Sequence, residues 1–129
     1  MATFPSDLKY TKNDEWTRLE GNTATIGVTD YAQEQLSDVV FVEIVVSEGD
    51  EIQKGDTIAS VESVKAAADV YSPVSGVVTA VNTELADEPE VINSDPYGKA
   101  WMIRVQLSDK SELDQLMDAQ AYEQQTGEE

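Results

Sequence analysis

Apolar and polar residues alternate along several short stretches of this chain, which is the pattern of half-buried β-strands. The clearest alternation covers residues 101–107, where the odd-numbered apolar side chains are predicted to face one way and the even-numbered ones, including Met102, the other. A second alternating stretch at 23–28 predicts another strand, and weaker alternation at 8–11 and 15–19 predicts a strand pair. The pattern therefore predicts a protein built mainly from short strands.

A pair of short strands is predicted near the middle of the chain, at 57–62 and 68–71. A Gly-Asp turn signal at Gly55 precedes the first, and a Ser-Pro-Val-Ser-Gly turn signal ending at Gly76 follows the second. The two strands would rise to Lys65 and return, so we expect this lysine at the tip of a hairpin.

The most apolar stretch runs from Val39 to Val46 and is rich in β-branched residues. This composition favours a strand over a helix of the same length, and a strand without polar alternation is typical of burial on both faces. We therefore predict a central core strand at 39–46. A further strand is predicted at 77–81.

Short helices are predicted where capping patterns precede apolar residues at helical spacing. Asp30 with Gln33 forms a capping-box pattern before a helix at 31–36, and Asn82 is predicted to cap a single turn that ends near Asp87.

The period changes again after Ser111, where apolar residues three and four apart predict a C-terminal helix at about 111–122. The polar residues 124–129 are expected to form a disordered tail. We expect one domain over residues 1–129, with a core at about 22–108 and a strand extension at 8–20.

The order of these elements is approximately symmetric about Lys65, because a strand, a glycine turn and a strand lie on each side of it. This symmetry predicts a mainly-β fold in which two small antiparallel sheets form a flattened barrel or sandwich. We expect the C-terminal helix to lie over one edge of it.

The charge balance restricts the partners. Twenty-six acidic and eight basic residues give a formal net charge of −18. Such a chain is repelled by nucleic acid and by anionic membranes, so we expect neither as a partner. Proteins with basic docking patches are the expected partners.

The sequence contains no cysteine and no histidine. Their absence excludes disulfides, thiolate nucleophiles, imidazole bases and the usual zinc ligand sets. No nucleophile lies beside a base in the sequence, so we expect a non-catalytic protein. The first residues contain no apolar or arginine-rich targeting segment. We expect a bacterial cytoplasmic protein, although a mature mitochondrial matrix form would look the same.

Lys65 is the candidate functional residue. Most lysines are solvated surface residues, which is the alternative interpretation here. Lys65, however, is the single cation in its neighbourhood, and Val64, Ala66 and Ala67 are apolar or small residues that would not crowd a modified side chain. A lysine at an exposed, rigid hairpin tip is suited to carry a tethered cofactor.

The segment Glu62-Ser63-Val64-Lys65-Ala66 lies between a Gly-Asp turn and a Pro-x-x-Gly turn, and it resembles the attachment site of lipoyl and biotinyl carrier domains. Four further segments resemble motifs of the H proteins of the glycine cleavage system: Thr29-Asp30-Tyr31-Ala32-Gln33, Asp38-Val39-Val40-Phe41-Val42-Glu43, Tyr71-Ser72-Pro73-Val74-Ser75-Gly76 and Ile92-Asn93-Ser94-Asp95-Pro96-Tyr97-Gly98. The resemblance extends from about residue 8 to residue 122.

This resemblance implies a lipoyl-type fold and a lipoate joined to Lys65 through an amide. The arm would accept an aminomethyl group from a pyridoxal-phosphate-dependent glycine decarboxylase and pass it to a tetrahydrofolate-dependent aminomethyltransferase. Dihydrolipoyl dehydrogenase would then reoxidise the arm, and lipoate-attaching enzymes would install it. A monomer is expected, because one hairpin must be presented to several enzymes.

The resemblance also assigns roles to four other residues. Glu15 and Asp69 match positions in a cleft that shelters the loaded arm, and the alternative for each is a solvated surface carboxylate. Glu62 and Gly76 match positions that help the lipoylating enzyme recognise its hairpin, although a backbone requirement for glycine also explains Gly76. The family often has histidine where this chain has Asp14, which weakens any proposal of a proton-handling imidazole.

Three other carrier functions remain open. A biotin carrier shares the hairpin but usually has methionine on both sides of the lysine, where this chain has Val64 and Ala66. A lipoyl domain of a 2-oxoacid dehydrogenase is normally followed by a Pro/Ala-rich linker and a catalytic domain, which this sequence lacks. An H-like protein could instead relay lipoyl groups to other carriers.

Overall fold

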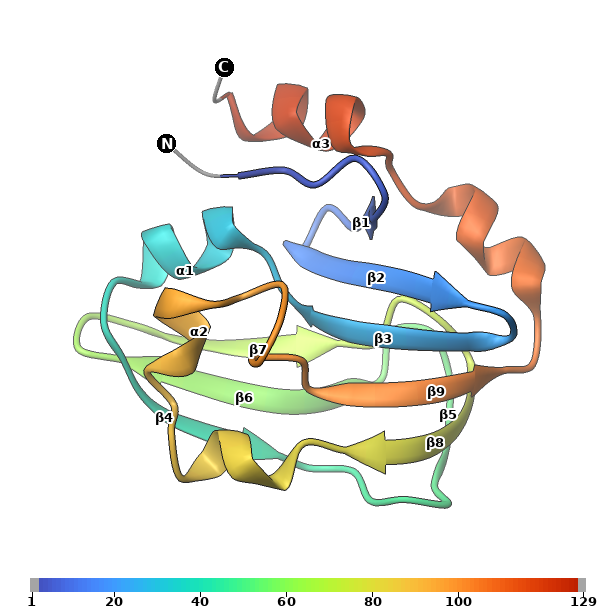
Figure 1. The fold of residues 1–129 in the computed structure, drawn as a ribbon, viewed down its shortest axis with the longest axis horizontal. Helices are drawn as coiled ribbons and strands as arrows, with labels where there is room; N and C mark the ends of the chain where they lie inside the picture. Colours follow the sequence, from blue (N-terminus) through green and yellow to red (C-terminus); the bar gives the residue numbers. More distant parts are fainter. Residues whose placement is uncertain (1–2, 128–129) are drawn as a thin grey trace.

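The computed structural model describes residues 3–127, which form two antiparallel β-sheets packed face to face with helices at their edges (Figure 1). The first sheet has six strands in the order β1 (Lys9–Tyr10), β2 (Glu15–Glu20), β3 (Thr23–Val28), β9 (Ile103–Leu107), β8 (Gly76–Val81) and β5 (Glu51–Ile52). The second has three strands in the order β4 (Val39–Ile44), β6 (Thr57–Ser63) and β7 (Ala67–Tyr71). The mainly-β sandwich is confirmed, but the sheets are unequal in size and do not close into a barrel.

The core lies between the two sheets. In register across β3 and β9, Ala24 faces Val105 and Ile26 faces Ile103, and all four side chains are buried. The strand predicted at 101–107 begins only at Ile103. Met102 is fully buried in the main core, and its backbone bonds both to β3 and to the segment after β8.

β4 is not the central, doubly buried strand that its composition predicts. It pairs with β6 and, within residues 3–127, with no other strand, so it forms an edge of the smaller sheet. Val39 and Val42 are buried, whereas Val40 and Phe41 are exposed. A shift in the β4–β6 register between Val39 and Phe41 breaks the alternation there.

Helix α1 (Asp30–Leu36) occurs where the sequence predicts it, but its N-cap is Thr29 and not Asp30. Thr29 is extended and its hydroxyl accepts a hydrogen bond from the Ala32 N–H at 3.1 Å, while Asp30 accepts one from the Gln33 side chain. The 3-10 helix η1 (Thr83–Ala86) and helix α2 (Val91–Ser94) follow β8. Asn82 occupies the N-cap position of η1, as predicted, but its side chain makes no capping hydrogen bond.

The predicted C-terminal helix is in fact two separate elements, the 3-10 helix η2 (Lys110–Gln115) and helix α3 (Ala119–Thr126). Between them Met117 pairs with Tyr10 through two backbone hydrogen bonds of 2.8 Å, and this extended bridge interrupts the helix. Residues 124–126 are helical, so the predicted disordered tail is wrong there, and residues 128–129 lie outside the described residues.

Helix α3 covers the β1 edge of the larger sheet, as predicted (Figure 1). Its Tyr122 is fully buried and stacks on the Tyr10 ring, with 4.7 Å between the ring centroids. Leu8 and Trp16 complete this second cluster. No helix within residues 3–127 has the length and apolar character needed to cross a membrane.

Candidate functional site

Lys65 lies in the turn between β6 and β7, as the sequence predicts, and it is exposed. The Ser63 hydroxyl fixes this turn: it accepts hydrogen bonds from the N–H groups of Ala66 and Lys65 and donates one to the Ala66 carbonyl. The Ser63 N–H also donates to the Ala66 carbonyl at 2.8 Å. The lysine backbone is therefore held by local bonds while its side chain projects from the fold.

Bonds to neighbouring elements tie the hairpin tip to the sandwich. β6 is the middle strand of its sheet, and the Val64 N–H donates to the Asp38 carbonyl at 3.0 Å. Beside it, the Asn93 side chain accepts a hydrogen bond from the Val39 N–H and donates to Gln33 and to the Ser37 carbonyl. The start of β4, α1 and α2 together support the tip.

Glu15 and Asp69 line the same cavity, which has a volume of about 200 Å³. Glu15 comes from β2 and Asp69 from β7, and Ala32 and Gln35 of α1 form another wall. Two acidic residues far apart in the sequence thus line one space next to the hairpin that carries Lys65. The arrangement is able to receive a cationic group.

Glu15 is 2% exposed, and its carboxylate is held by two donors. The Thr11 hydroxyl donates to Oε1 at 2.7 Å, and the Tyr71 N–H donates to Oε2 at 3.0 Å. Burial raises the pKa of Glu15 to about 7, although both hydrogen bonds act in the opposite direction. Near neutral pH this carboxyl group therefore exchanges readily between its neutral and charged forms. Asp69, in contrast, is exposed.

Asp14 also lines this cavity. It adopts a left-handed backbone conformation with a φ of 70°, and burial raises the pKa of its carboxyl group. The Tyr122 hydroxyl donates to its Oδ1 at 2.8 Å. The Tyr122 hydroxyl has a single proton, which it uses in the bond to Asp14. The Thr29 hydroxyl therefore donates to the Tyr122 oxygen in the 2.6 Å bond between them.

The structure separates the two residues expected to guide lipoylation. Glu62 is exposed on β6, close to Lys65 along the strand. Gly76 lies in the other sheet, where it pairs with Leu107, and it is buried. A Cβ atom there would lie 2.0 Å from the Gln106 carbonyl oxygen, so close backbone packing by itself requires glycine at this position.

Sequence reasoning missed three residues that organise this region: Ser63, Gln35 and Tyr122. Ser63 has a local signal, because a serine at the start of a tight turn often bonds backbone groups two and three residues ahead. Gln35 and Tyr122 have none, since Gln35 lines the cavity only through tertiary packing and Tyr122 reaches the site only through its hydrogen bond to Asp14.

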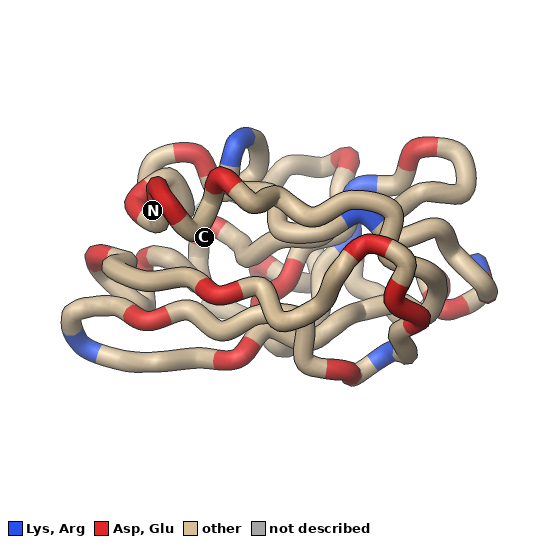
Figure 2. The backbone as a smooth tube through the Cα atoms, turned by 90° about the horizontal axis from the view of Figure 1, so that it is seen from below, with Lys and Arg blue, Asp and Glu red and all other residues tan. Residues whose placement is uncertain are grey.

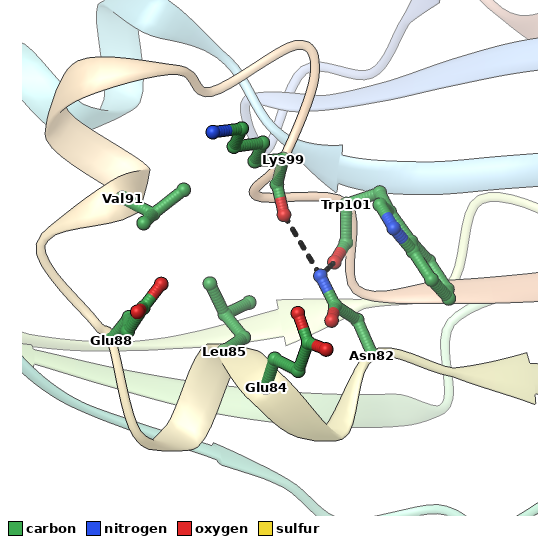
Figure 3. A pocket seen from close by; sticks show the side chains of 7 residues that line it. All are labelled: Asn82, Glu84, Leu85, Glu88, Val91, Lys99 and Trp101. Carbon is green, nitrogen blue, oxygen red and sulfur yellow. Dashed lines mark hydrogen bonds between the residues drawn. The ribbon is translucent and has the colours of Figure 1, made fainter.

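A separate cavity of about 270 Å³ lies between η1, α2 and the segment before β9 (Figure 3). Leu85 and Val91 point into it, and the Asn82 side chain donates to the carbonyls of Lys99 and Trp101 along one wall. It shares no residue with the predicted site. Glu15 also borders a further cavity of about 450 Å³.

Known proteins match this chain over nearly its whole length. A family model described as glycine cleavage H-protein matches residues 8–129. The glycine cleavage system H protein of Staphylococcus saprophyticus subsp. saprophyticus is 55% identical over 124 residues, covering 96% of this chain and 98% of that protein. The H protein of Carboxydothermus hydrogenoformans is 50% identical, covering 95% and 94% of the two chains.

The fold is similar to a solved structure as well. The crystal structure of a glycine cleavage system H protein from Mycobacterium marinum superposes with a TM-score of 0.84 at 34% identity, covering 95% of this chain and 98% of that one. Sequence and fold therefore agree over nearly the full length. The chain belongs to the glycine cleavage H-protein family.

Proposed function

We propose that this protein is the lipoyl carrier of the glycine cleavage system, with lipoate joined to Lys65 through an amide. Its arm takes the aminomethyl group of glycine from glycine decarboxylase to aminomethyltransferase and is then reoxidised by dihydrolipoyl dehydrogenase. A lipoate-attaching enzyme installs the arm, and the carrier works as a monomer. Membership of the family supports the role, and the single observation that carries it is the exposed lysine at a hairpin turn fixed by Ser63.

The residues around Lys65 fit an acylated side chain. Lys65, Ala66 and Ala67 are exposed, and the two alanines leave room beside the lysine for an amide and an alkyl chain. When bound, lipoate supplies a dithiolane that accepts a carbon group and two electrons, chemistry that a chain without cysteine cannot supply. The protein contributes position, because Ser63 and the three-stranded sheet hold the attachment point.

Glu15 and Asp69 would hold the cationic end of a loaded arm in their shared cavity. A buried carboxylate attracts an ammonium group strongly because little water screens the charge. Proximity to a cation favours the charged form, so binding would lower the pKa of Glu15 from about 7 and complete its ionisation. The buried side chain also limits access of water to the amine.

Intact mass spectrometry tests the attachment. The purified chain is incubated with a lipoate ligase, lipoate and ATP, next to Lys65→Arg and Lys54→Arg variants. Lys54 is a matched control, because it is an exposed lysine in the turn that precedes β6. We expect one lipoyl adduct on the parent and on Lys54→Arg and none on Lys65→Arg, with peptide mapping to locate it.

The lipoylated protein is then added to glycine decarboxylase, and exchange of labelled bicarbonate into glycine is followed. Exchange that requires the adduct supports the carrier role. An adduct without exchange favours the lipoate relay, and a biotin adduct formed by a biotin ligase in place of the lipoyl one favours a biotin carrier. A parent chain that stays unmodified would contradict the proposal.

A further inference from the structure

Three large apolar side chains are exposed beside the hairpin tip. Val40 is 56% exposed, Phe41 46% and Val64 66%, and we call these three residues the tip-side patch. Val64 precedes Lys65 directly, and its N–H bonds the carbonyl of Asp38 at the start of the β4 segment. A cluster of exposed apolar side chains on a strongly acidic protein is unusual and marks an interaction surface.

The β4–β6 register explains why neighbouring residues of one strand are both exposed. Val39 pairs with Ser63 and Phe41 with Glu62, so Val40 is an extra residue in β4 and forms a bulge. Phe41, Glu62 and Ala67 form one row across the three strands, and all three are exposed. The patch therefore continues from the edge of the sheet onto its outer face.

The outer face of the hairpin adds an acidic hollow next to the patch. The hollow has a volume of about 370 Å³ and is lined by Ser60, Glu62, Ala67, Ala68 and Asp69. Figure 2 shows the hairpin with acidic segments on its strands and a basic segment at its turn. A partner surface that matches this region must combine apolar side chains with lysine or arginine.

We propose that the tip-side patch and the acidic hollow form the docking surface for the lipoate-attaching enzyme, which covers the patch with apolar side chains and places basic side chains in the hollow. The inference rests on the proposed function, in which Lys65 is acylated. Acyl transfer joins the lipoyl carbonyl to Nζ and releases a proton and the leaving group of the enzyme-bound activated lipoate.

Because the patch lies directly beside Lys65, it is better placed to contact the lipoate-attaching enzyme than the enzymes that use the finished arm. Acylation occurs at Nζ itself, so the active site must enclose the lysine and contact the residues on either side of it. The enzymes that use the finished arm meet its far end and need no contact with Val64 or Phe41. β4 is also an edge strand, since within residues 3–127 it pairs with β6 alone, and edge strands are common sites of contact with a partner chain.

The test compares a Val40→Ser/Phe41→Ser double variant with Val45→Ser. Val45 is a matched control, because it is 52% exposed and lies at the opposite end of the same apolar stretch. Lipoylation rates are measured by intact mass at increasing carrier concentration. We expect the double variant to raise KM roughly tenfold or more with little change in kcat, and Val45→Ser to stay within about twofold of the parent.

Two further variants complete the design. Val64→Ser lies outside the strand and should raise KM without any effect on the sheet, while Glu62→Gln should raise KM and make it less dependent on salt. Thermal unfolding checks that each variant remains folded.

Equal KM values for the double variant, Val64→Ser and Val45→Ser would overturn the inference. Normal lipoylation of the double variant with impaired glycine exchange would also overturn it, because the surface would then serve the decarboxylase. Failure of the parent chain to accept lipoate is a different result, since it removes the proposed function itself.

Discussion

The raised pKa of Glu15 predicts that ionising this residue opposes folding, and a Glu15→Gln variant isolates the effect. The side chain of glutamine has nearly the same shape as that of glutamate. Its amide oxygen can accept from the Tyr71 N–H. Its amide nitrogen then faces the Thr11 hydroxyl, which already accepts from the N–H groups of Asn13 and of residue 15, so the bond to Thr11 is lost at every pH.

The pKa of Glu15 is raised from its ordinary value of 4.5 to about 7. Between these two values the folded state binds more protons than the unfolded state, so the free energy of unfolding falls as the pH rises through this window. The difference of about 2.5 pH units corresponds to roughly 3 kcal/mol, which is fully lost above pH 7. Glutamine does not ionise, so the variant lacks this loss.

Urea unfolding of the parent and of Glu15→Gln, followed by tryptophan fluorescence at several pH values from 4.5 to 8, measures the difference. Relative to the parent, we expect the variant to gain about 3 kcal/mol of stability between pH 4.5 and pH 8, added to a pH-independent loss from the missing Thr11 bond. Subtracting the two curves removes the effect of the other carboxyl groups, which both proteins share. A difference that does not vary with pH would refute the reasoning.

Three substitutions test the packing around the site, each by urea unfolding at pH 7. Gly76→Ala should destabilise by at least about 3 kcal/mol, because the new Cβ would lie 2.0 Å from the Gln106 carbonyl, and a loss below 1 kcal/mol would contradict this. Asn93→Ala should cost about 2 kcal/mol through the lost bonds from α2 to α1, to the Ser37 carbonyl and to β4, and a neutral result would show that water replaces them. Tyr122→Phe should cost about 2 kcal/mol, since it leaves the partly buried Asp14 carboxylate without its donor, and unchanged stability would be inconsistent with the bond.

The hairpin and the place of Lys65 were predictable because their signals are local. A turn signal at each end and β-forming residues between them define two strands of nearly equal length around the lysine. The error at β4 has a physical cause. A run of β-branched residues is expected both for a strand buried in a core and for an edge strand that presents apolar side chains to a partner, and sequence alone does not separate the two.

Local sequence patterns could not predict the cavity. Glu15 and Asp69 were named through resemblance, but that they line one space depends on how β2, β7 and α1 pack. The C-terminal helix was mispredicted because the pairing of Met117 with Tyr10, which interrupts it, joins distant parts of the chain. The bond from Tyr122 to Asp14 spans 108 residues and has no sequence signature.

The net charge of −18 and the exposed apolar edge of β4 are best understood together. An edge strand with exposed Val40 and Phe41 favours association with a second copy of the chain, because edge strands tend to pair and apolar surface is exposed there. Two such copies repel each other, and Asp38, Glu43 and Glu62 around the edge place part of that repulsion at the point of contact. The same acidic residues attract a partner with a basic surface. The acidity therefore allows the protein to keep an apolar docking surface next to Lys65 while disfavouring self-association through that surface.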